Sequence, residues 1–321
     1  MKVLIIGLGS MGKRRLRLIR DIDSSINIIG LDSNEERSEE VSKEYGIAVY
    51  KDLSSVMSEG DMDAVFVCTS PLSHHNIIDK LLEYDIPIFT ELNLVSDGYE
   101  KFINEEKLFL SSTFLYREDI KWIINKVNGM RVNYVYHTGQ YLPDWHPWED
   151  YRKYFVGEKK SNGCREIMAI ELPWITEAFG DIVDFNVIRD KMSDLEVDYP
   201  DNYMMSFVHK SGIVGLVAVD VVSRNASRRL EVFGENNHIL WDGKPDSLKD
   251  YNLESGQFET IRVYDDVVHR EGYSSNIIEN AYRAEIEAFF SLVAGKKDSV
   301  RYSFKKDYKI LQLIDSIESE G

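Results

Sequence analysis

Short apolar runs alternate with longer mixed segments through the first third of the chain. The runs predict buried strands, and the segments between them, with apolar residues every three or four positions, predict helices. The predicted strands are Val3–Ile6, Ile26–Leu31, Ile47–Tyr50, Asp63–Thr69, Ile86–Thr90 and Leu108–Phe114. The predicted helices are Lys13–Arg20, Asn34–Tyr45, Ser73–Tyr84 and Arg117–Val127. This alternation predicts a doubly wound parallel sheet, whose ligands bind at the carboxyl ends of the strands.

The pattern changes after residue 131, where strand-like segments follow one another without helices of comparable length. They are rich in β-branched and aromatic residues and are separated by Gly, Asn or Asp turns. The predicted strands are Val132–Tyr141, Val183–Asp190, Tyr203–Val208, Ile213–Val222, Arg229–Phe233 and His238–Trp241. Helices at Asn276–Ala294 and Lys305–Glu318 close the chain and are candidates to return to the first domain. We therefore predict an α/β chain with a parallel-sheet domain over residues 1–118. Residues 119–321 form an α+β domain with a large, open, mainly antiparallel sheet.

The turn after the first strand has the composition of a dinucleotide-binding loop. Gly7, Gly9 and Gly12 form a G-x-G-x-x-G sequence directly behind an apolar strand. The first glycine permits the tight turn, the second lets the backbone approach a pyrophosphate, and the third lets the helix pack closely on the strand. Backbone amides at the helix start, with Ser10 and Met11, can then hold the phosphates. The context predicts a Rossmann fold with a bound dinucleotide, and a glycine turn without a ligand is the alternative.

Asp32 ends the second predicted strand, 20 residues after Gly12, and is followed by Ser33. This is the usual distance for a carboxylate that accepts hydrogen bonds from the adenosine ribose. Its charge disfavours a 2′-phosphate, so we expect NAD rather than NADP. The basic residues 13–15 could favour a phosphate. We expect them to be solvated on the first helix and to be outweighed by Asp32.

Composition excludes several classes of protein. A chain of 321 residues is long enough for two domains with sizeable cores. The net charge of −17 and the pI of about 4.9 argue against nucleic acid as a partner. No apolar run approaches the ~20 residues that a membrane span needs, and the chain enters its first strand at once, so we expect a cytoplasmic protein. The two cysteines and seven scattered histidines form no disulfide framework or zinc pattern, and no metal site is expected.

Two strand ends join the glycine loop and Asp32 in a resemblance to a known family. The segments CTSPLSHH (residues 68–75) and FTELN (residues 89–93), with the predicted open-sheet second domain, resemble the Gfo/Idh/MocA family of oxidoreductases over nearly the whole length. The resemblance implies NAD as cofactor, a sugar-like small-molecule substrate, and a homodimer or homotetramer formed through the second sheet. It assigns cofactor contacts to Thr69, Ser70, Pro71, His74, Glu91 and Asn93.

The chain departs from this family at the residues that move protons. The lysine of the family's E-K-P motif is Leu92 here. In the best match to the family's second motif, within Asn162–Trp174, the aspartate and histidine positions hold Ile167 and Ile170. A shift of one residue would put Glu166 at the aspartate position. Aliphatic side chains cannot accept or donate a proton, so either other groups carry it or the chain has lost ordinary turnover while retaining NAD.

The segment Gly139–Arg152 is the densest polar and aromatic stretch, and its two prolines predict a structured loop rather than a helix. Asp144 and His146 offer an acid–base pair, with His146 the preferred proton carrier and His137 an alternative. The competing interpretation is that this loop only packs across the domain interface. The catalytic candidates are His146, Asp144 and Glu166.

The candidates for substrate contact share an aromatic ring, an amide or a guanidinium group near the predicted cleft. They are Tyr116, Arg117, Gln140, Tyr141, Trp148, Arg152 and Arg165. The alternative for Arg117 is a salt bridge at a helix start with Glu118 or a nearby carboxylate. The alternative for Arg165 is a surface pair with Glu166.

Three functions fit these observations. The first is an NAD-dependent oxidoreductase acting on a sugar, cyclitol or nucleotide-activated sugar through atypical proton-transfer residues. The second is an enzyme that uses NAD transiently for epimerisation or elimination. The third is a catalytically silent NAD-binding sensor or scaffold. The intact cofactor fingerprint favours the first.

Overall fold

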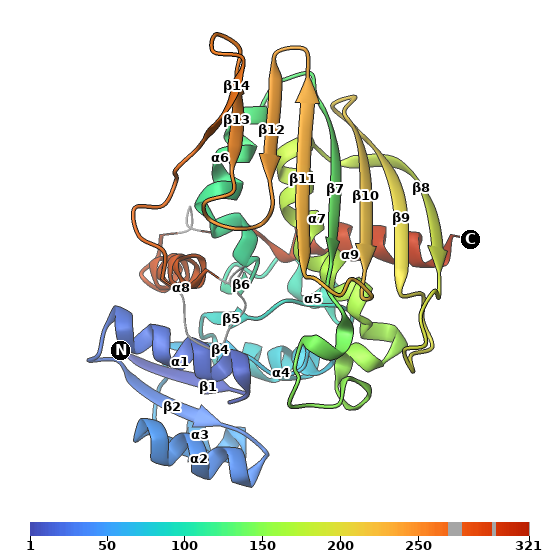
Figure 1. Ribbon diagram of the computed structural model, residues 1–321. Helices are drawn as coiled ribbons and strands as arrows, with labels where there is room; N and C mark the ends of the chain where they lie inside the picture. The colour runs from blue at the N-terminus through green and yellow to red at the C-terminus, as the bar shows by residue number, and fades with distance from the viewer. Residues whose placement is uncertain (269–277, 297–299, 321) are drawn as a thin grey trace. The chain divides into compact units, whose positions relative to one another are not determined.

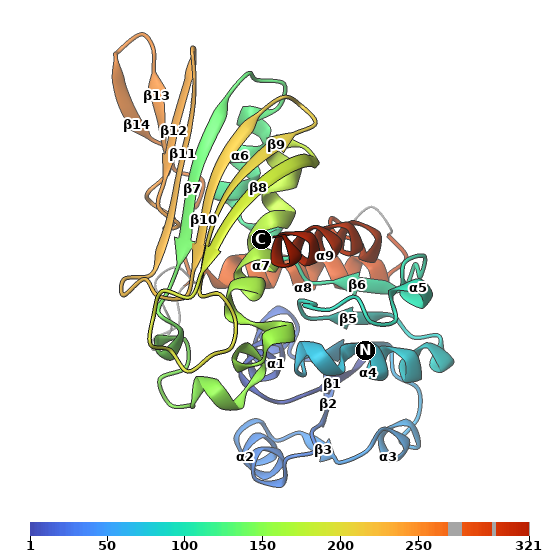
Figure 2. The same ribbon diagram turned by 90° about the vertical axis from the view of Figure 1, so that its right-hand side faces the viewer.

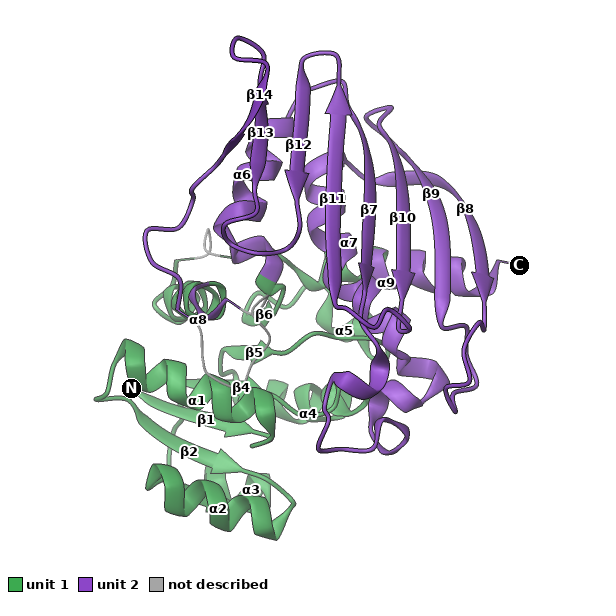
Figure 3. Cartoon of the chain, viewed as in Figure 1, with its two compact units in different colours: residues 1–113, 281–309 green, residues 114–280, 310–321 purple. Residues whose placement is uncertain are grey.

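The computed structural model describes residues 1–268, 278–296 and 300–320. The chain divides into two compact units, shown in Figure 3. Unit 1 comprises residues 1–113 and 281–309, and unit 2 comprises residues 114–280 and 310–321. The first division falls five residues before the predicted boundary at residue 118, and residues 281–309 return to unit 1. None of the described helices combines the length and apolar character that crossing a membrane requires.

Unit 1 contains a parallel sheet of six strands in the order β3-β2-β1-β4-β5-β6 (Figure 1). The strands are β1 (Lys2–Ile6), β2 (Asn27–Leu31), β3 (Ala48–Tyr50), β4 (Ala64–Val67), β5 (Ile88–Thr90) and β6 (Leu108–Leu110). The order reverses beside β1, as in doubly wound nucleotide-binding folds. The predicted fold class of the first domain is therefore confirmed.

Unit 1 also contains helices that connect or cover these strands. They are α1 (Ser10–Ile22), α2 (Glu35–Tyr45), α3 (Leu53–Met57), α4 (His74–Leu81), α5 (Tyr99–Phe102) and α8 (Glu279–Val293), whose residues from 281 belong to unit 1, with the 3-10 turns η1 (Pro71–Ser73) and η2 (Leu82–Tyr84). Helix α2 begins where the Asn34 side chain accepts a hydrogen bond from the Arg37 amide. The short helices α3 and α5 were not predicted. The predicted start at Asn276 lies outside the described residues.

The predicted strand Leu108–Phe114 is wrong beyond Leu110. The Ser111 amide still donates to the Thr90 carbonyl at 2.9 Å, but the Ser112 amide donates to Glu285 Oε1 at 2.7 Å. Because the Ser112 amide bonds to this carboxylate, it does not continue the hydrogen-bond ladder of the sheet. The 3-10 turn η3 (Thr113–Tyr116) follows. A side chain from residue 285 is a partner that local sequence does not indicate.

Aromatic rings join α8 to the sheet in unit 1. The ring of Phe289 lies 5.0 Å from that of Phe66 and 5.6 Å from those of Phe89 and Phe109, measured between centroids. Edge-to-face contacts of this kind add to the burial of large apolar surfaces. The return of α8 therefore completes the core of the first unit.

Unit 2 is built on a mixed sheet of eight strands in the order β14-β13-β12-β11-β7-β10-β9-β8. The strands are β7 (Asn133–Gly139), β8 (Ile182–Asp190), β9 (Asn202–His209), β10 (Val214–Asp220), β11 (Ser227–Gly234), β12 (Asn237–Trp241), β13 (Lys249–Asn252) and β14 (Gln257–Thr260). The pair β7 and β10 is parallel and the other neighbours are antiparallel. The predicted large, mainly antiparallel sheet is confirmed.

Helices cover one face of this sheet. They are α6 (Glu118–Val127), α7 (Gly163–Phe179) and α9 (Phe304–Ser319), whose residues up to 309 belong to unit 1. Along β7, Tyr134 stacks on Phe179 of α7 at 4.1 Å, whereas the next residue, Val135, is 41% exposed. Figure 2 views the sheet from its β8 edge, with α6 and α7 on one side and no described helix of unit 2 on the other.

The predicted loop at Gly139–Arg152 contains no α-helix and is ordered by short 3-10 turns. The turns in and after it are η4 (Leu142–Asp144), η5 (Tyr151–Lys153), η6 (Phe155–Gly157) and η7 (Lys159–Ser161). Asp150 caps η5 by accepting a hydrogen bond from the Arg152 amide at 3.1 Å. The loop leads directly into α7, whose first turn carries Glu166.

Candidate functional site

The glycine loop of unit 1 fits the close approach of a pyrophosphate. Gly7 has φ +87°, and a Cβ atom there would lie 2.8 Å from Thr69 Cγ2. A Cβ atom on Gly12 would lie 1.9 Å from the Gly7 carbonyl oxygen, so α1 packs here without room for a side chain. A Cβ atom on Gly9 would meet nothing within 4 Å, and no side chain caps α1, which begins at Ser10. The start of α1 therefore has room beside Gly9 and no side-chain cap, both of which suit phosphate binding.

Asp32 is fixed at the end of β2 by backbone amides. Its Oδ2 accepts from the Leu8 amide and its Oδ1 from the Asn34 amide, both at 2.8 Å. Arg37 Nη1 lies 3.1 Å from Oδ2, and Ser33 beside it is exposed. The carboxylate is only 5% exposed and stands next to the glycine loop through Leu8. Its position fits the ribose contact predicted from the sequence.

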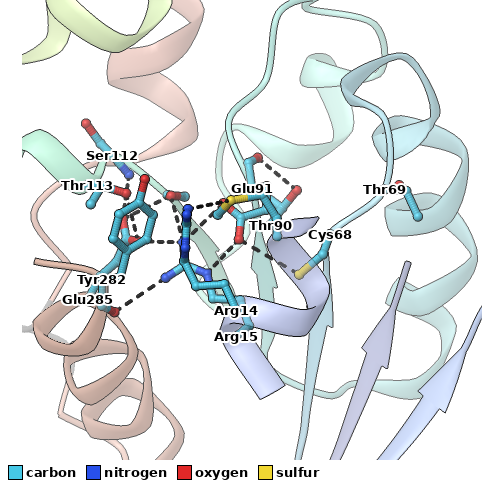
Figure 4. A network of polar contacts seen from close by, with 12 residues as sticks. Arg14, Arg15, Cys68, Thr69, Thr90, Glu91, Ser112, Thr113, Tyr282 and Glu285 are labelled. Carbon is cyan, nitrogen blue, oxygen red and sulfur yellow. Dashed lines mark hydrogen bonds and ion pairs between the residues drawn. The ribbon is translucent and has the colours of Figure 1, made fainter. Parts of the chain in front are cut away.

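A buried ion network connects α1, the end of β5 and α8 (Figure 4). Arg15 donates to both carboxylate oxygens of Glu91, and its Nη2 also donates to Glu285 Oε2 at 2.7 Å. Burial lowers the pKa of Arg15, but the charges of Glu91 and Glu285 raise it more. Burial also raises the pKa of Glu285, which Arg15 opposes. The network holds the predicted cofactor residue Glu91 in one orientation.

The expectation that residues 13–15 are solvated is wrong for two of the three. Arg15 is fully buried, and Arg14 is 4% exposed with its guanidinium 4.6 Å from the centre of the Tyr282 ring. The physical reason is that α8 supplies both a carboxylate and an aromatic ring to this face of α1. Lys13 alone keeps a surface partner, Glu40, at 2.7 Å.

A chain of hydrogen bonds connects the ends of β4 and β5. His74 Nε2 lies 3.0 Å from the Thr69 carbonyl oxygen, and its Nδ1 lies 2.7 Å from Asn93 Oδ1. Asn93 Nδ2 donates to the Tyr99 hydroxyl, which donates to Asp307. Burial lowers the pKa of His74. Both ring nitrogens therefore contact protein groups, and the side chain fixes the backbone beside the glycine loop.

The remaining predicted cofactor residues surround the start of α4. Ser70 is exposed, Pro71 is buried at the first position of η1, and Thr69 is partly buried against Gly7. Cofactor contact by these residues stays a prediction, supported by their place at the carboxyl ends of β4 and β5.

In unit 2, the three arginines predicted to contact substrate all form ion pairs with carboxylates. Their carboxylate partners are Asp119 for Arg117, Asp150 and Glu196 for Arg152, and Asp315 and Glu318 for Arg165. The alternative interpretation of Arg117, a salt bridge at a helix start, is confirmed by its 2.6 Å contact with Asp119. The alternative pair of Arg165 with Glu166 stays a prediction.

The other predicted substrate residues differ in accessibility. Tyr116 is buried, Gln140 and Tyr141 are partly buried, and Trp148 is 75% exposed. The Tyr141 ring lies under the guanidinium of Arg224 at 3.7 Å. Their contact with a substrate stays a prediction.

Three polar side chains without hydrogen-bond partners lie around the loop and the first turn of α7. Glu166 Oε2, Tyr154 Oη and His146 Nδ1 are each buried and form no hydrogen bond with the described residues. The rings of His146 and Tyr154 are 5.1 Å apart, and burial together with the charge of Glu166 raises the pKa of Tyr154. Native proteins rarely leave buried polar atoms unpaired unless water or a ligand meets them. We call these three residues the acid–base cluster.

Glu166 has the acid–base behaviour that proton transfer near neutral pH requires. Burial raises the pKa of its carboxyl group to about 7. Burial lowers the pKa of His146, which the charge of Glu149 at 3.8 Å partly offsets. The structure thus brings His146 and Glu166 into one cluster through Tyr154, which the sequence analysis missed although it lies two residues beyond the predicted loop.

Two other candidates lie apart from this cluster. Asp144 is exposed at the end of η4. His137 projects from β7 on the same side as Val135, opposite to the face that α7 covers, and its Nε2 lies 2.8 Å from Asp220 Oδ2. Neither arrangement leaves an unpartnered buried atom among the described residues.

Comparisons with known proteins agree with this geometry. Residues 1–95 match the family model GFO_IDH_MocA, described as "Oxidoreductase family, NAD-binding Rossmann fold". The chain is similar to the inositol 2-dehydrogenase/D-chiro-inositol 3-dehydrogenase of Lacticaseibacillus casei, with 28% identity over 110 residues. That alignment spans 33% of this chain and 32% of the curated relative.

Solved structures of similar fold cover nearly the whole chain. A levoglucosan dehydrogenase in complex with NADH has a TM-score of 0.78 at 18% identity, over 99% of this chain and 95% of that one. A UDP-N-acetylglucosamine 3-dehydrogenase from Acidithiobacillus ferrooxidans has a TM-score of 0.74 at 17% identity, over 99% and 96%. These likenesses establish the fold of both units. The description of the matched family confirms NAD as the predicted cofactor. Residues 1–95 of the chain therefore match the NAD-binding Rossmann-fold model of the Gfo/Idh/MocA family of oxidoreductases.

Proposed function

We propose that this chain is an NAD-dependent oxidoreductase that acts on a hydroxyl or ketone group of a sugar, a cyclitol or a nucleotide-activated sugar. The observation that carries the proposal is the glycine loop beside Asp32, with open space at Gly9 and no side-chain cap on α1. The similar proteins named above act on inositol, levoglucosan and a nucleotide sugar, which supports this range of substrates.

In unit 1, amides at the start of α1 would hold the pyrophosphate and Asp32 the adenosine ribose. The turn that follows β4, with Thr69, Ser70, Pro71 and His74, and the turn that follows β5, with Glu91 and Asn93, would border the nicotinamide half. When bound, NAD supplies the hydride acceptor. The ion network of Arg15 and the hydrogen bonds of His74 keep these two turns in place.

In unit 2, Glu166 is the proposed proton acceptor. When an alcohol becomes a ketone, its carbon loses a hydride and its hydroxyl group loses a proton, which Glu166 Oε2 would take. A carboxyl group with a pKa of about 7 is close to half ionised at neutral pH, which suits it to accept and release that proton. His146 and Tyr154 would orient the hydroxyl group. Asp144 stays a weaker candidate because it is exposed.

One observation favours a second function, a catalytically silent NAD-binding sensor or scaffold. Leu92 and Ile170 occupy positions where the family resemblance implies proton-carrying residues, and no side chain from these positions can replace that chemistry. Transient use of NAD for epimerisation or elimination is a related possibility that also needs a base. The three unpartnered polar atoms of the acid–base cluster favour turnover over the silent function.

The test has two steps. Calorimetry with NAD should show binding, and NADH formation should then follow on addition of sugars, cyclitols or nucleotide sugars. Glu166→Gln should retain NAD binding and lose turnover about 100-fold or more. Glu158→Gln, an exposed carboxylate before the same helix, is the matched control and should keep full activity. NAD binding without turnover across the whole panel would favour the silent function, and no NAD binding would refute both.

We also propose that the protein is located in the cytoplasm and forms a homodimer or homotetramer. Its subunits would meet through the face of the unit 2 sheet that no described helix of unit 2 covers, here called the outer face. Apolar side chains on that face include Val135, Ile188, Met204, Leu216 and Phe233, between 41% and 75% exposed. An extended apolar face of this kind is typical of a protein interface.

A further inference from the structure

We infer that the substrate of this site carries no phosphate group: it is a free polyhydroxy compound rather than a sugar phosphate or a nucleotide-activated sugar. The inference rests on the proposed oxidoreductase function and narrows its substrate class. It follows from the way in which charges are paired around the acid–base cluster in unit 2.

Guanidinium groups are the usual partners of phosphate because their N–H groups match its oxygens in pairs. Arg152 lies in the loop that carries His146, and its guanidinium group donates two hydrogen bonds to the Asp150 carboxylate. Its Nε lies 2.8 Å from Oδ1 and its Nη2 lies 2.9 Å from Oδ2. Its Nη1 donates to Glu196. Two carboxylates therefore outnumber one guanidinium, and the group as a whole is negative.

Arg165 is similarly occupied one residue before Glu166. Its Nη2 lies 2.6 Å from Asp315 Oδ1, and its Nη1 donates to Glu318. Its side chain is only 5% exposed, so it cannot turn towards a ligand without leaving both carboxylates. This group too carries one negative charge in excess.

The loop itself adds to the negative field. Besides Asp150 and Arg152, which belong to the group described above, residues 139–154 contain two carboxylates (Asp144 and Glu149) and one cation (Lys153), which gives a further net charge of −1 with His146 neutral. Glu166 adds a further negative charge when it is ionised above its pKa of about 7. A phosphate brought to the acid–base cluster would be repelled by this field.

The three atoms that lack hydrogen bonds to the described residues suit hydroxyl groups. Glu166 Oε2 accepts a hydrogen bond, Tyr154 Oη both donates and accepts, and His146 Nδ1 does one or the other according to its tautomer. A polyol offers a donor and an acceptor at every hydroxyl group and can pair with all three. A phosphate oxygen, which only accepts, would face the carboxylate oxygen of Glu166 without a shared proton whenever Glu166 is ionised.

The experiment compares matched pairs on the NAD-loaded protein: myo-inositol with myo-inositol 1-phosphate, and glucose with glucose 6-phosphate, with UDP-glucose as a fifth ligand. Binding is measured by calorimetry and turnover by NADH formation. We expect the unphosphorylated member of at least one pair to bind at least about tenfold more tightly than its phosphate, a difference of about 1.4 kcal/mol. UDP-glucose should bind no better than glucose.

A variant tests the cause. Asp150→Asn with Glu196→Gln frees Arg152 from both carboxylates and should increase the affinity for the phosphorylated ligands at least about threefold. Glu158→Gln, which removes a nearby charge without freeing an arginine, should not. No gain in the double variant would show that the ion pairs do not exclude phosphate and would overturn the inference.

Other outcomes separate the inference from the proposed function. Tighter binding or faster turnover of the phosphates or of UDP-glucose overturns the inference and leaves the oxidoreductase in place. If that preference is lost in Arg224→Ala, the exposed cation over Tyr141 is the phosphate site. Equal or absent binding of both members of each pair also counts against the inference. NAD binding without NADH formation counts against the oxidoreductase alone, because the pairwise binding still tests the ligand class.

Discussion

Arg15 donates two hydrogen bonds to Glu91, from Nε to Oε1 at 2.6 Å and from Nη2 to Oε2 at 3.1 Å. This pair connects the helix behind the glycine loop with the end of β5, where the resemblance to the family implies a cofactor contact. Glu285 of α8 completes the site around the same guanidinium. Three charges share a buried position, so the stability of each depends on the others.

Removal of the Arg15 guanidinium should destabilise the protein strongly. Arg15→Met would leave Glu91 and Glu285 buried without a counter-charge, and breaking a buried ion pair typically costs about 3–5 kcal/mol in the free energy of unfolding. Urea denaturation measures the loss. Lys13→Ala, which removes a surface pair on the same helix, should cost about 1 kcal/mol or less. The triple variant Arg15→Met/Glu91→Gln/Glu285→Gln should recover part of the loss, and no recovery would contradict the electrostatic explanation.

Alanine substitutions at Gly9 and Gly12 should have different effects on folding stability and on cofactor binding. Gly9→Ala adds a methyl group to open space, so the melting temperature should hardly change while the affinity for NAD falls about tenfold or more, because the backbone no longer reaches the pyrophosphate. Gly12→Ala places its methyl group 1.9 Å from the Gly7 carbonyl oxygen and should lower both the melting temperature and the affinity for NAD. Thermal melting and calorimetry on each variant distinguish the cases. Unchanged NAD binding in Gly9→Ala would remove the assignment of the phosphate site.

Glu166 should make stability depend on pH with a defined sign. Its carboxyl pKa is about 7 in the folded chain against an ordinary value of 4.5, so the folded state holds a proton that the unfolded state releases between these values. Stability relative to Glu166→Gln should therefore fall as the pH rises from about 4.5 to 7 and stay constant above. Melting temperatures of both proteins at pH 5, 6, 7 and 8 test this, with an advantage of roughly 2–4 °C expected for Glu166→Gln at pH 8. If the melting temperatures of the two proteins changed with pH in the same way, Glu166 would not be buried in its charged form.

The outer face of the unit 2 sheet should hold subunits together. Leu216 on β10 is 53% exposed, and a charge at this position would be costly inside an apolar interface. Leu216→Glu should therefore yield a monomer of 37 kDa by light scattering, whereas the unmodified protein should have a larger mass. Met192→Glu, an equally exposed apolar residue beyond the end of β8, is the control and should leave the assembly intact. A monomeric unmodified protein would refute the proposed interface.

The candidate site was only partly predictable. The pattern of glycines with Asp32 indicated the cofactor loop because those residues act through their own backbone or at a fixed sequence distance. Arg15 was expected on the surface because its partners lie 76 and 270 residues away, and helical periodicity carries no information about them. Tyr154 escaped notice because a single tyrosine in a loop has no pattern of its own, and only its lack of a partner singles it out.

Sequence alone determined the order of strands and helices, the doubly wound first domain, the open sheet of the second and the class of cofactor, since these depend on local periodicity and on backbone freedom at particular glycines. Tertiary structure decided where α8 ends up, why β6 stops at Leu110, and which arginines are already paired with carboxylates. Those outcomes depend on charges and rings that are far apart in the sequence and meet only in the folded chain. Whether an arginine is already paired with a carboxylate then decides what else it can bind. For this reason the arginines that the sequence indicated as substrate contacts are already occupied by carboxylates in the folded protein.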